Sequence, residues 1–249
     1  MQEIEFKFQV PVKKRKALQK AFTLLKAEPI HLAAQYFDTA DQTLAKHCIA
    51  IRRRQENDEW KQTFKAVDTA KVLSRLELEF DIAPPETTTL DLDNYKDYSA
   101  IYKKLKRALG LPLPTLELLF ETNIQRLRVL QNIGSSTVEI ALDIGKIFKE
   151  QNSVDIFEIE FELKQGSIED LIAFIRPWVQ KYQLSLDTHS KSDYGLLAVR
   201  QQSSFSAQYQ TPLVLNRSSS EVEALQSIVA NCLQHLLPNA SSIARQQYS

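Results

Sequence analysis

Carboxylate side chains recur at every second position in several segments of this chain. In residues 157–163 (FEIEFEL), Glu158, Glu160 and Glu162 share one face of a strand, and the apolar residues share the other. Same-sign charges that face each other across a sheet are destabilising unless something neutralises them. Because carboxylate oxygens are ligands that Mg²⁺ and Mn²⁺ prefer, these rows predict a metal site. The same alternation occurs in residues 3–10, 75–82 and 138–144.

Basic side chains form a second set with the same spacing. Residues 48–55 and 59–66 predict two strands joined by a hairpin turn at Asn57-Asp58. This register places the basic side chains of the pair on one face: Arg52, Arg54, Lys61 and Lys65. Arginine and lysine clusters bind phosphate oxygens. Carboxylates and cations on one sheet face therefore predict a site for a polyanion bridged to a metal ion.

An ordinary antiparallel sheet with one face in water is the competing interpretation, since it also alternates apolar and charged residues. Any single strand of this chain fits that interpretation. Four strands with segregated charge fit it poorly, because a solvated face usually mixes both signs with Thr, Ser and Gln. The pattern therefore favours one shared sheet face that brings acidic and basic residues together: Glu3, Glu5, Glu158, Glu160, Arg52 and Arg54.

Composition excludes several other classes of protein. The 31 basic and 31 acidic residues give a formal net charge of zero, whereas a general nucleic-acid binder needs a basic surplus. Cys48 and Cys232 match no zinc spacing, and the four histidines are scattered. The N-terminus does not resemble a signal peptide, and no apolar run reaches the length of a membrane span. We therefore expect a cytoplasmic protein with no nucleic-acid or membrane partner.

Helical patterns separate the predicted strands. Residues 98–109 end at Gly110, which is a typical helix stop signal. Residues 168–184 begin after Ser167 in a sequence that resembles a capping box, and Pro177 should kink this helix. Two further helices are predicted at residues 12–27 and 191–202, the second with Gly195 as a weak point, and residues 122–130 are a less regular strand candidate.

The composition changes near residue 202. Residues 203–249 read as a linker followed by one amphipathic helix at 219–237, with Val222, Leu225 and Val229 on its apolar face. A single helix cannot bury such a stripe alone. It must dock on the preceding domain, on a second copy of the chain in a homodimer, or on other sequence.

Several short motifs then resemble, in order, the CYTH family, also called the triphosphate tunnel metalloenzymes. Glu3-Ile4-Glu5-Phe6-Lys7 is similar to the ExExK hallmark of that family, which is a weak signal on its own. The other matching elements follow over about residues 2–200: Tyr36-Phe37-Asp38-Thr39, Ala50-Ile51-Arg52-Arg53-Arg54, Thr63-Phe64-Lys65, Arg75-Leu76-Glu77, Arg126, the acidic strands around Asp143 and Glu160, and Ser190-Lys191-Ser192. Seven elements in order are a strong signal.

The resemblance implies a fold and a division of the chain. Its fold would be α+β, a closed eight-stranded antiparallel barrel with flanking helices and a C-terminal helical extension. Residues 1–202 would form the triphosphate tunnel domain. Residues 203–249 resemble only the beginning of the helical CHAD domain that often follows CYTH in bacterial inorganic triphosphatases, so the polyphosphate-binding role of CHAD is not carried over.

The resemblance also implies roles for single residues. The substrate-binding cations would be Lys7, Arg52, Arg54, Lys65, Arg75, Arg126 and Lys191, of which alternation independently supports Arg52, Arg54 and Lys65. The ligands of Mg²⁺ or Mn²⁺ would be Glu3, Glu5, Asp143, Glu158 and Glu160. Glu5, Lys7 and Glu160 would be catalytic, with Lys7 stabilising the leaving group.

The implied reaction is metal-dependent hydrolysis of inorganic triphosphate to pyrophosphate and phosphate. Related tunnels hydrolyse thiamine triphosphate or cyclise ATP, and both activities remain alternatives. A third alternative is a sensor that binds triphosphate or polyphosphate without turning it over. We predict that phosphate release from inorganic triphosphate, ATP and thiamine triphosphate with Mg²⁺ or Mn²⁺ separates these alternatives.

Overall fold

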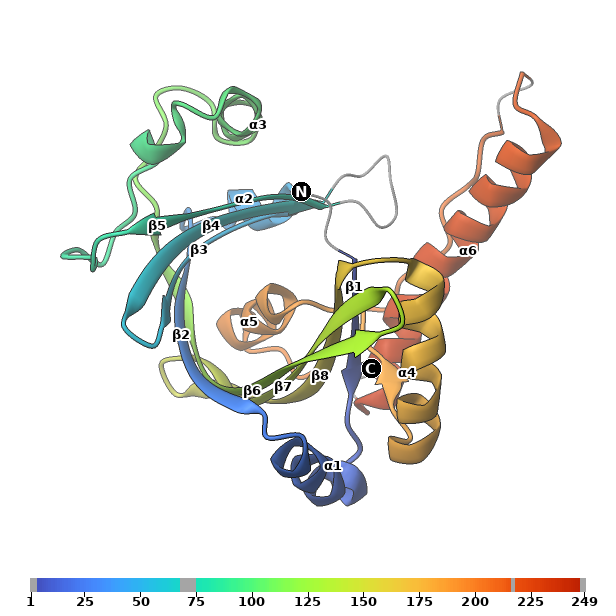
Figure 1. Ribbon diagram of the computed structural model, residues 1–249. Coiled ribbons are helices and arrows are strands. Elements are labelled where there is room, and N and C mark those ends of the chain that lie inside the picture. Colours follow the sequence, from blue (N-terminus) through green and yellow to red (C-terminus); the bar gives the residue numbers. More distant parts are fainter. Residues whose placement is uncertain (1–3, 68–74, 216–217, 247–249) are drawn as a thin grey trace.

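One curved antiparallel sheet forms the centre of the molecule. The computed structural model describes residues 4–67, 75–215 and 218–246, apart from the side chains of Val67 and Arg75. Its nine strands have the order β5-β4-β3-β2-β6-β7-β8-β1-β9 (Figure 1). The strands are β1 (Glu5–Gln9), β2 (Glu28–Asp38), β3 (Ile49–Glu56), β4 (Glu59–Val67), β5 (Arg75–Ile82), β6 (Glu117–Ile133), β7 (Ser136–Lys149), β8 (Asn152–Gln165) and β9 (Ser185–Leu186).

Six α-helices and one short 3-10 helix accompany the sheet in the described part of the chain. They are α1 (Val12–Leu24), α2 (Thr43–Lys46), η1 (Asp93–Tyr95), α3 (Ser99–Leu109), α4 (Ile168–Tyr182), α5 (Lys191–Arg200) and α6 (Glu221–Ala244). The helices predicted at 12–27, 98–109, 168–184 and 191–202 are confirmed with ends that differ by a few residues. The Ser167 hydroxyl caps α4 by accepting a hydrogen bond from the Asp170 amide, which is half of the predicted capping box, while the Asp170 carboxylate accepts from the Ser136 hydroxyl.

The prediction of a closed eight-stranded barrel is wrong. Among the described residues, β5 pairs only with β4, and β9 pairs only with β1, so the sheet is curved but keeps two edges. The ninth strand is a two-residue segment that extends the sheet beyond β1. Pro84 and Pro85 follow β5 closely, and proline cannot donate to a strand ladder. The antiparallel α+β class is confirmed.

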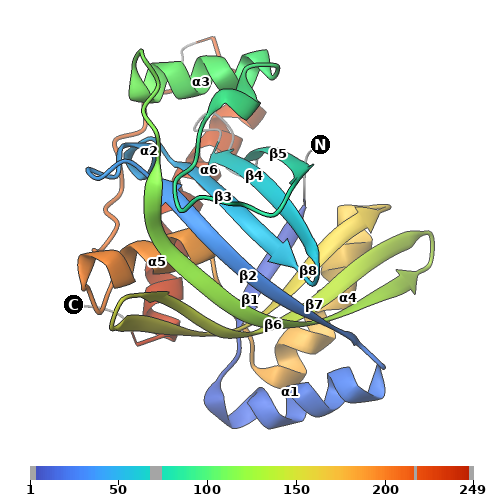
Figure 2. The same ribbon diagram turned by 90° about the vertical axis from the view of Figure 1, so that its left-hand side faces the viewer.

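The apolar residues of the alternating strands cover the convex face. Helices α1 and α4 pack on β1, β7 and β8, where Phe8, Ile140 and Phe161 are buried with Leu18 and Leu171. At the other end of the molecule, η1 and α3 cover β3 and β4 (Figures 1 and 2). Each fully buried aliphatic or aromatic side chain contributes about 1.5–3 kcal/mol. The convex face is therefore a core, and the charged residues are left to the concave face.

Helix α5 lies inside the curve of the sheet (Figure 1). Tyr194 and Leu197 of this helix are buried against Ile30, Phe120 and Ile147, which belong to the concave sides of β2, β6 and β7. The helix begins at Ser190, which forms a capping box with Asp193. Apolar packing therefore fills one part of the concave face and fixes the first residue of α5, Lys191, at its border.

Gly195, predicted as a weak point of this helix, has a packing role. A Cβ atom at this position would collide with the ring of Phe120. Because overpacking a buried site costs about 1–3 kcal/mol, we expect Gly195→Ala to lower the free energy of unfolding by that amount. Urea denaturation measures it, with Ser192→Ala on the same helix as the control. Equal stability of the two variants would contradict this packing.

Helix α6 continues beyond its predicted end. It runs to Ala244 with Pro238 inside it, whereas residues 219–237 were expected. Its C-terminal end docks on the domain through the buried Ser241, while Val222, Leu225 and Val229 on its N-terminal half stay exposed. Docking on the preceding domain is thus confirmed for one end of the helix only. No helix among the described residues is long and apolar enough to cross a membrane.

Candidate active site

The register of four strands brings acidic and basic residues onto one concave face. Lys7 on β1 lies opposite Glu160 on β8. Asp143 on β7 lies between Glu158 on β8 and Arg126 on β6. Since side chains opposite each other in a ladder share a face, the strands place these groups together. The prediction that alternate residues of several strands converge is confirmed for these positions.

Three carboxylates form the centre of the site. Asp143, Glu158 and Glu160 each present an oxygen, and these oxygens all lie within 4.8 Å of one another. The Lys191 ammonium contacts all three, at 2.7 Å from Asp143, 2.5 Å from Glu158 and 2.9 Å from Glu160. The Arg126 guanidinium donates two hydrogen bonds of 2.7 Å to Asp143 and one of 2.5 Å to Glu160.

Burial and charge act in opposite directions on this cluster. Burial alone would raise the pKa of Asp143 and Glu160, but the Lys191 and Arg126 cations lower both pKa values below their ordinary range. Burial would also lower the pKa of Lys191, which the carboxylates of Asp143 and Glu158 instead raise. Asp143, Glu160 and Lys191 are therefore all charged at neutral pH.

Lys7 borders the same cluster. Its ammonium lies 3.6 Å from Glu158 and donates a hydrogen bond to the backbone oxygen of His189. Burial would lower the pKa of Lys7, but the Glu158 and Asp187 carboxylates raise it. Lys7 is thus a charged, buried donor held from two sides.

A second, mainly basic group lies on β3, β4 and β5. The Arg52 guanidinium lies 3.9 Å from Glu79, and that of Arg54 lies 3.4 Å from the same carboxylate. The Thr63 hydroxyl donates to Glu79 at 2.9 Å and accepts from Arg52 at 3.3 Å. Lys61 lies 3.9 Å from Glu79. One carboxylate therefore orients three cations, and the hairpin register predicted from sequence is confirmed.

Lys65 completes this group. Its ammonium lies 2.9 Å from Glu77, on the facing strand β5. Both side chains are roughly one quarter exposed, which leaves the lysine partly accessible to an anion. Such an ion pair at the surface contributes at most about 1 kcal/mol, so a phosphate can displace it cheaply.

Tyr36 links the two groups of charges. Its hydroxyl accepts a hydrogen bond of 3.4 Å from Arg52. Burial would raise the pKa of Tyr36, but the positive charges of Arg52, Lys191 and Lys65 lower it. Burial lowers the pKa of Arg54, and the positive charges of Arg52 and Arg126 lower it further. In the strand register, Arg54 on β3 lies opposite Ala34 on β2, which lies opposite Thr122 on β6. Thr122 shares a face of β6 with Arg126, so both groups face the same space.

Three predicted residues are placed less fully. Glu3 lies outside the described residues, and so does the side chain of Arg75, which begins β5. Glu5 is exposed near the end of β1, and its charge helps to raise the pKa of Arg126. Glu5 therefore lies at the border of the cluster. All the other predicted site residues are within it or within the basic group.

Sequence reasoning missed several groups that contact the site. Glu56 lies 3.3 Å from Arg54 and 3.9 Å from Arg128. The alternation of β3 places Glu56 two residues after Arg54 on the same face, so this signal was present. Asp187 had no such signal, because it lies in an irregular segment between β9 and α5.

Asp187 interacts with Lys7 through its charge and through its backbone amide, which donates a hydrogen bond to the Lys7 backbone oxygen. It is buried and accepts hydrogen bonds from the Tyr194 hydroxyl at 2.9 Å and from the His189 amide at 3.0 Å. Burial would raise the pKa of Asp187, but the His189 side chain, the Lys7 charge and these two hydrogen bonds lower it from 3.8 to about 2. The carboxylate therefore stays ionised throughout the physiological range.

This shift predicts a pH dependence of stability. A carboxyl group whose pKa is lower in the folded state stabilises the fold above its unfolded pKa, and this stabilisation is lost as the pH falls through the folded value. The difference between 3.8 and about 2 corresponds to about 2 kcal/mol. Asp187→Asn should cost about that much at pH 7, and the cost should shrink between pH 4 and pH 2. Urea denaturation at several pH values measures it. A cost that does not change with pH would contradict the prediction.

The central carboxylates fit a hard divalent cation. Their donor atoms are all oxygen, as Mg²⁺ and Mn²⁺ prefer, and they are close enough to share one ion. The neighbouring cations Lys7, Arg126 and Lys191 balance the carboxylates one for one. The site therefore matches a metal that arrives together with an anion.

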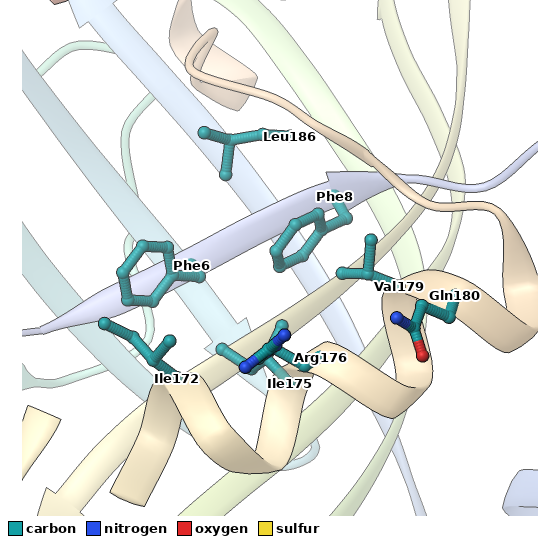
Figure 3. Close-up of a pocket in the computed structure, with 8 residues that line it drawn as sticks. All are labelled: Phe6, Phe8, Ile172, Ile175, Arg176, Val179, Gln180 and Leu186. Atoms are coloured by element: carbon teal, nitrogen blue, oxygen red, sulfur yellow. The ribbon is translucent and has the colours of Figure 1, made fainter. Parts of the chain in front are cut away.

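An apolar groove lies elsewhere. Phe6 and Phe8 of β1 line it from one side, and Ile175 and Val179 of α4 line it from the other (Figure 3). Its volume is about 360 Å³ and its walls are almost wholly apolar. Because Phe6 and Phe8 point away from Lys7 in the alternation of β1, the groove is on the opposite face of the sheet. It plays no part in the charged site.

Comparisons with known proteins identify the family of the sequence. A profile of the CYTH domain matches residues 1–193. An inorganic triphosphatase of Haemophilus influenzae is 32% identical over 201 residues, which cover 79% of this chain and 55% of that protein. The chain thus spans about half the length of this curated relative.

Solved structures share the fold. A candidate adenylate cyclase from Bacillus halodurans has a TM-score of 0.55 at 21% identity, covering 76% of this chain and 94% of its own. A candidate adenylyl cyclase from Hippeastrum, with a dominant triphosphatase activity, also has a TM-score of 0.55, at 18% identity, covering 80% of this chain and 96% of its own. Identity this low shows a common fold and nothing further.

Proposed function

This chain belongs to the CYTH-domain family, and on that premise we propose that it hydrolyses inorganic triphosphate to pyrophosphate and phosphate with a divalent cation. One observation carries the proposal: the carboxylate cluster that fits a metal and the basic group of β3 and β4 face the same space. The name of the Haemophilus influenzae relative supports the choice of substrate.

The basic group is suited to binding the phosphate chain. Arg52, Arg54 and Lys65 are already charged and held in place by carboxylates on neighbouring strands. Fixed cations need no reorganisation when the anion arrives, so most of their interaction energy remains available for binding. We include Arg75 in this group because it begins the Arg75-Leu76-Glu77 motif.

The carboxylate cluster would hold Mg²⁺ or Mn²⁺. Asp143, Glu158 and Glu160 are the ligands, with Glu5 at the border and Glu3 proposed from its motif. Such a cation, when bound, neutralises phosphate charge and lowers the pKa of water. Lys191 and Arg126 keep the carboxylates ionised and lie where they can contact phosphate oxygens.

Lys7 is the proposed hydrogen-bond donor to the leaving pyrophosphate. It is buried, charged and oriented by the backbone oxygen of His189 and by Glu158. A leaving pyrophosphate gains negative charge as the bond breaks, and a fixed ammonium stabilises that charge. Glu5 and Glu160 are the carboxylates that we propose to take part in catalysis, by holding the metal and the attacking water.

The other enzymatic activities implied by the family require an organic group beside the phosphates. Thiamine triphosphate hydrolysis and ATP cyclisation both need an apolar surface near the basic group. The apolar groove of β1 and α4 is on the opposite face of the sheet, and α5 packs apolar side chains into part of the concave face. These observations favour the inorganic substrate.

A substrate panel tests the proposal. Phosphate release is measured from inorganic triphosphate, ATP and thiamine triphosphate, with Mg²⁺, with Mn²⁺ and with a chelator. We expect release from inorganic triphosphate that requires a divalent cation and exceeds release from the other two substrates. Tight binding of inorganic triphosphate without release would support the sensor instead. Faster release from ATP or thiamine triphosphate would show that the proposed substrate is wrong.

Further statements about the whole protein remain proposals. We place a domain boundary near residue 202 because α5 ends at Arg200 and belongs to the concave face. Three other statements stay predictions: residues 203–249 resemble the start of a CHAD domain, two copies pair through the exposed side of α6, and the protein is cytoplasmic.

A further inference from the structure

The C-terminal end of α6 is tied to the segment that holds Lys7. Ser241 of α6 is fully buried. Its hydroxyl accepts a hydrogen bond of 3.1 Å from the Thr188 amide and lies 3.2 Å from the backbone oxygen of Leu186. Its own backbone oxygen accepts a hydrogen bond of 3.0 Å from the Gln9 side chain on β1. One serine thus joins α6, β9 and β1.

We propose that Ser241 and Arg245 are positioning residues for the active site. Through them, the C-terminal end of α6 holds residues 186–190 in place and thereby fixes the ammonium of Lys7; we call this arrangement the clamp. This inference rests on the proposed function of the site, and it assigns a role to residues beyond the 1–193 span of the CYTH match.

The path from Ser241 to Lys7 is short. Thr188, held by Ser241, stands between Asp187 and His189. The backbone oxygen of His189 accepts a hydrogen bond from the Lys7 ammonium, and the Asp187 amide donates one of 2.8 Å to the Lys7 backbone oxygen. A shift of the clamped segment therefore moves the acceptor that orients the ammonium of Lys7.

Arg245 is tied to the same segment indirectly, through Tyr194. Its guanidinium lies 4.1 Å from the ring centre of Tyr194 and donates a hydrogen bond of 2.6 Å to the backbone oxygen of Asp155. Tyr194 in turn donates to the Asp187 carboxylate at 2.9 Å. A cation over an aromatic ring contributes about 0.5–2 kcal/mol, so Arg245 stabilises the ring that holds Asp187.

The clamp should affect turnover more than substrate affinity. Lys7 is one of several cations around the triphosphate, so a small displacement changes ground-state binding little. Transition-state stabilisation is more sensitive to position, since a misplacement of about 1 Å can cost about 10²-fold in rate. We therefore expect Ser241→Ala to lower kcat for inorganic triphosphate about tenfold and to change KM less than threefold.

A double-mutant cycle distinguishes positioning from general destabilisation. Ser241→Ala is measured in the natural chain and again in a Lys7→Met chain. If Ser241 acts through Lys7, it should lower kcat about tenfold in the first and less than twofold in the second. Equal factors in the two backgrounds would overturn the proposal, because a merely structural effect does not depend on Lys7.

Ser242→Ala is the matched control for the helix. The hydroxyls of Ser241 and Ser242 each lie within hydrogen-bond distance of a backbone oxygen one turn earlier, at 2.9 Å from that of Leu237 and at 3.1 Å from that of Pro238. Among the described residues, no hydrogen bond joins Ser242 to residues 186–190. It should leave kcat unchanged. Arg245→Lys should keep most of the activity that Arg245→Ala loses, because lysine keeps the cation over Tyr194.

Hydrogen exchange tests the clamp without relying on activity. Ser241→Ala should raise the exchange rate of the Thr188 and His189 amides by at least tenfold, and Ser242→Ala should not. Unchanged exchange in Ser241→Ala would overturn the clamp. A chain that shows the exchange effect but no triphosphate hydrolysis would keep the clamp and refute the proposed function instead.

Discussion

Replacing Glu160 with glutamine should lower metal-dependent phosphate release from inorganic triphosphate about 10³-fold. The Glu160 carboxylate belongs to the cluster that fits the metal, and it accepts from both Lys191 and Arg126. Removing one preorganised charge from a site of this kind costs about 10²–10³-fold. Loss of a proposed metal ligand should put the effect at the upper end of that range. Phosphate release at saturating Mg²⁺ and Mn²⁺ measures it.

The same variant should remain folded. Glutamine keeps the shape of the side chain, although two buried cations lose part of their balance and stability falls by a few kcal/mol. Asp155→Asn is the control, since Asp155 lies on the same strand but is paired with Lys146 at the surface. Full activity of folded Glu160→Gln would contradict the metal assignment. Equal losses of activity in Glu160→Gln and Asp155→Asn would contradict the placement of the active site on the concave face of β8.

Replacing Arg52 with glutamine should weaken substrate binding rather than abolish turnover. Arg52 is held by Thr63, Tyr36 and Glu79, and its guanidinium is mostly buried on the concave face. A hydrogen bond to a charged group contributes about 1.5–3 kcal/mol, which corresponds to roughly 10–150-fold in affinity. We expect KM for inorganic triphosphate to rise by that factor and kcat to change less.

Arg53 offers a matched control one residue away. Its side chain lies on the other face, over the ring of Phe37, and donates to the backbone oxygen of Thr87. Arg53→Gln removes the same charge from the same strand, so it should change KM less than threefold. If both variants raise KM equally, substrate attraction depends on net charge and not on the concave face.

The period of two in the strands was sufficient to predict which residues share a face of the sheet. Glu158, Glu160 and Asp143 lie together because each alternates with apolar residues that the convex core requires. The hairpin turn at Asn57-Asp58 likewise predicted the correct pairing of Arg54 with Lys61. Burial of one face of a strand determines its register, and register determines which charges become neighbours.

The rest depended on contacts that no local pattern encodes. Closure of the barrel was inferred from the family resemblance, whereas the sheet ends in the short β9 on one side and β5 on the other. The position of Lys191 over three carboxylates depends on how α5 packs in the concave face. The docking of α6 depends on the polar residue Ser241, while an amphipathic pattern predicts docking through apolar residues.

A crystal structure with Mn²⁺ and a non-hydrolysable triphosphate tests the central claim most directly. The account predicts an anomalous Mn²⁺ signal within coordination distance of Asp143, Glu158 or Glu160, and phosphate oxygens in contact with Arg52 or Arg54. Mn²⁺ and triphosphate bound on the convex side, or away from both groups of charges, would contradict it.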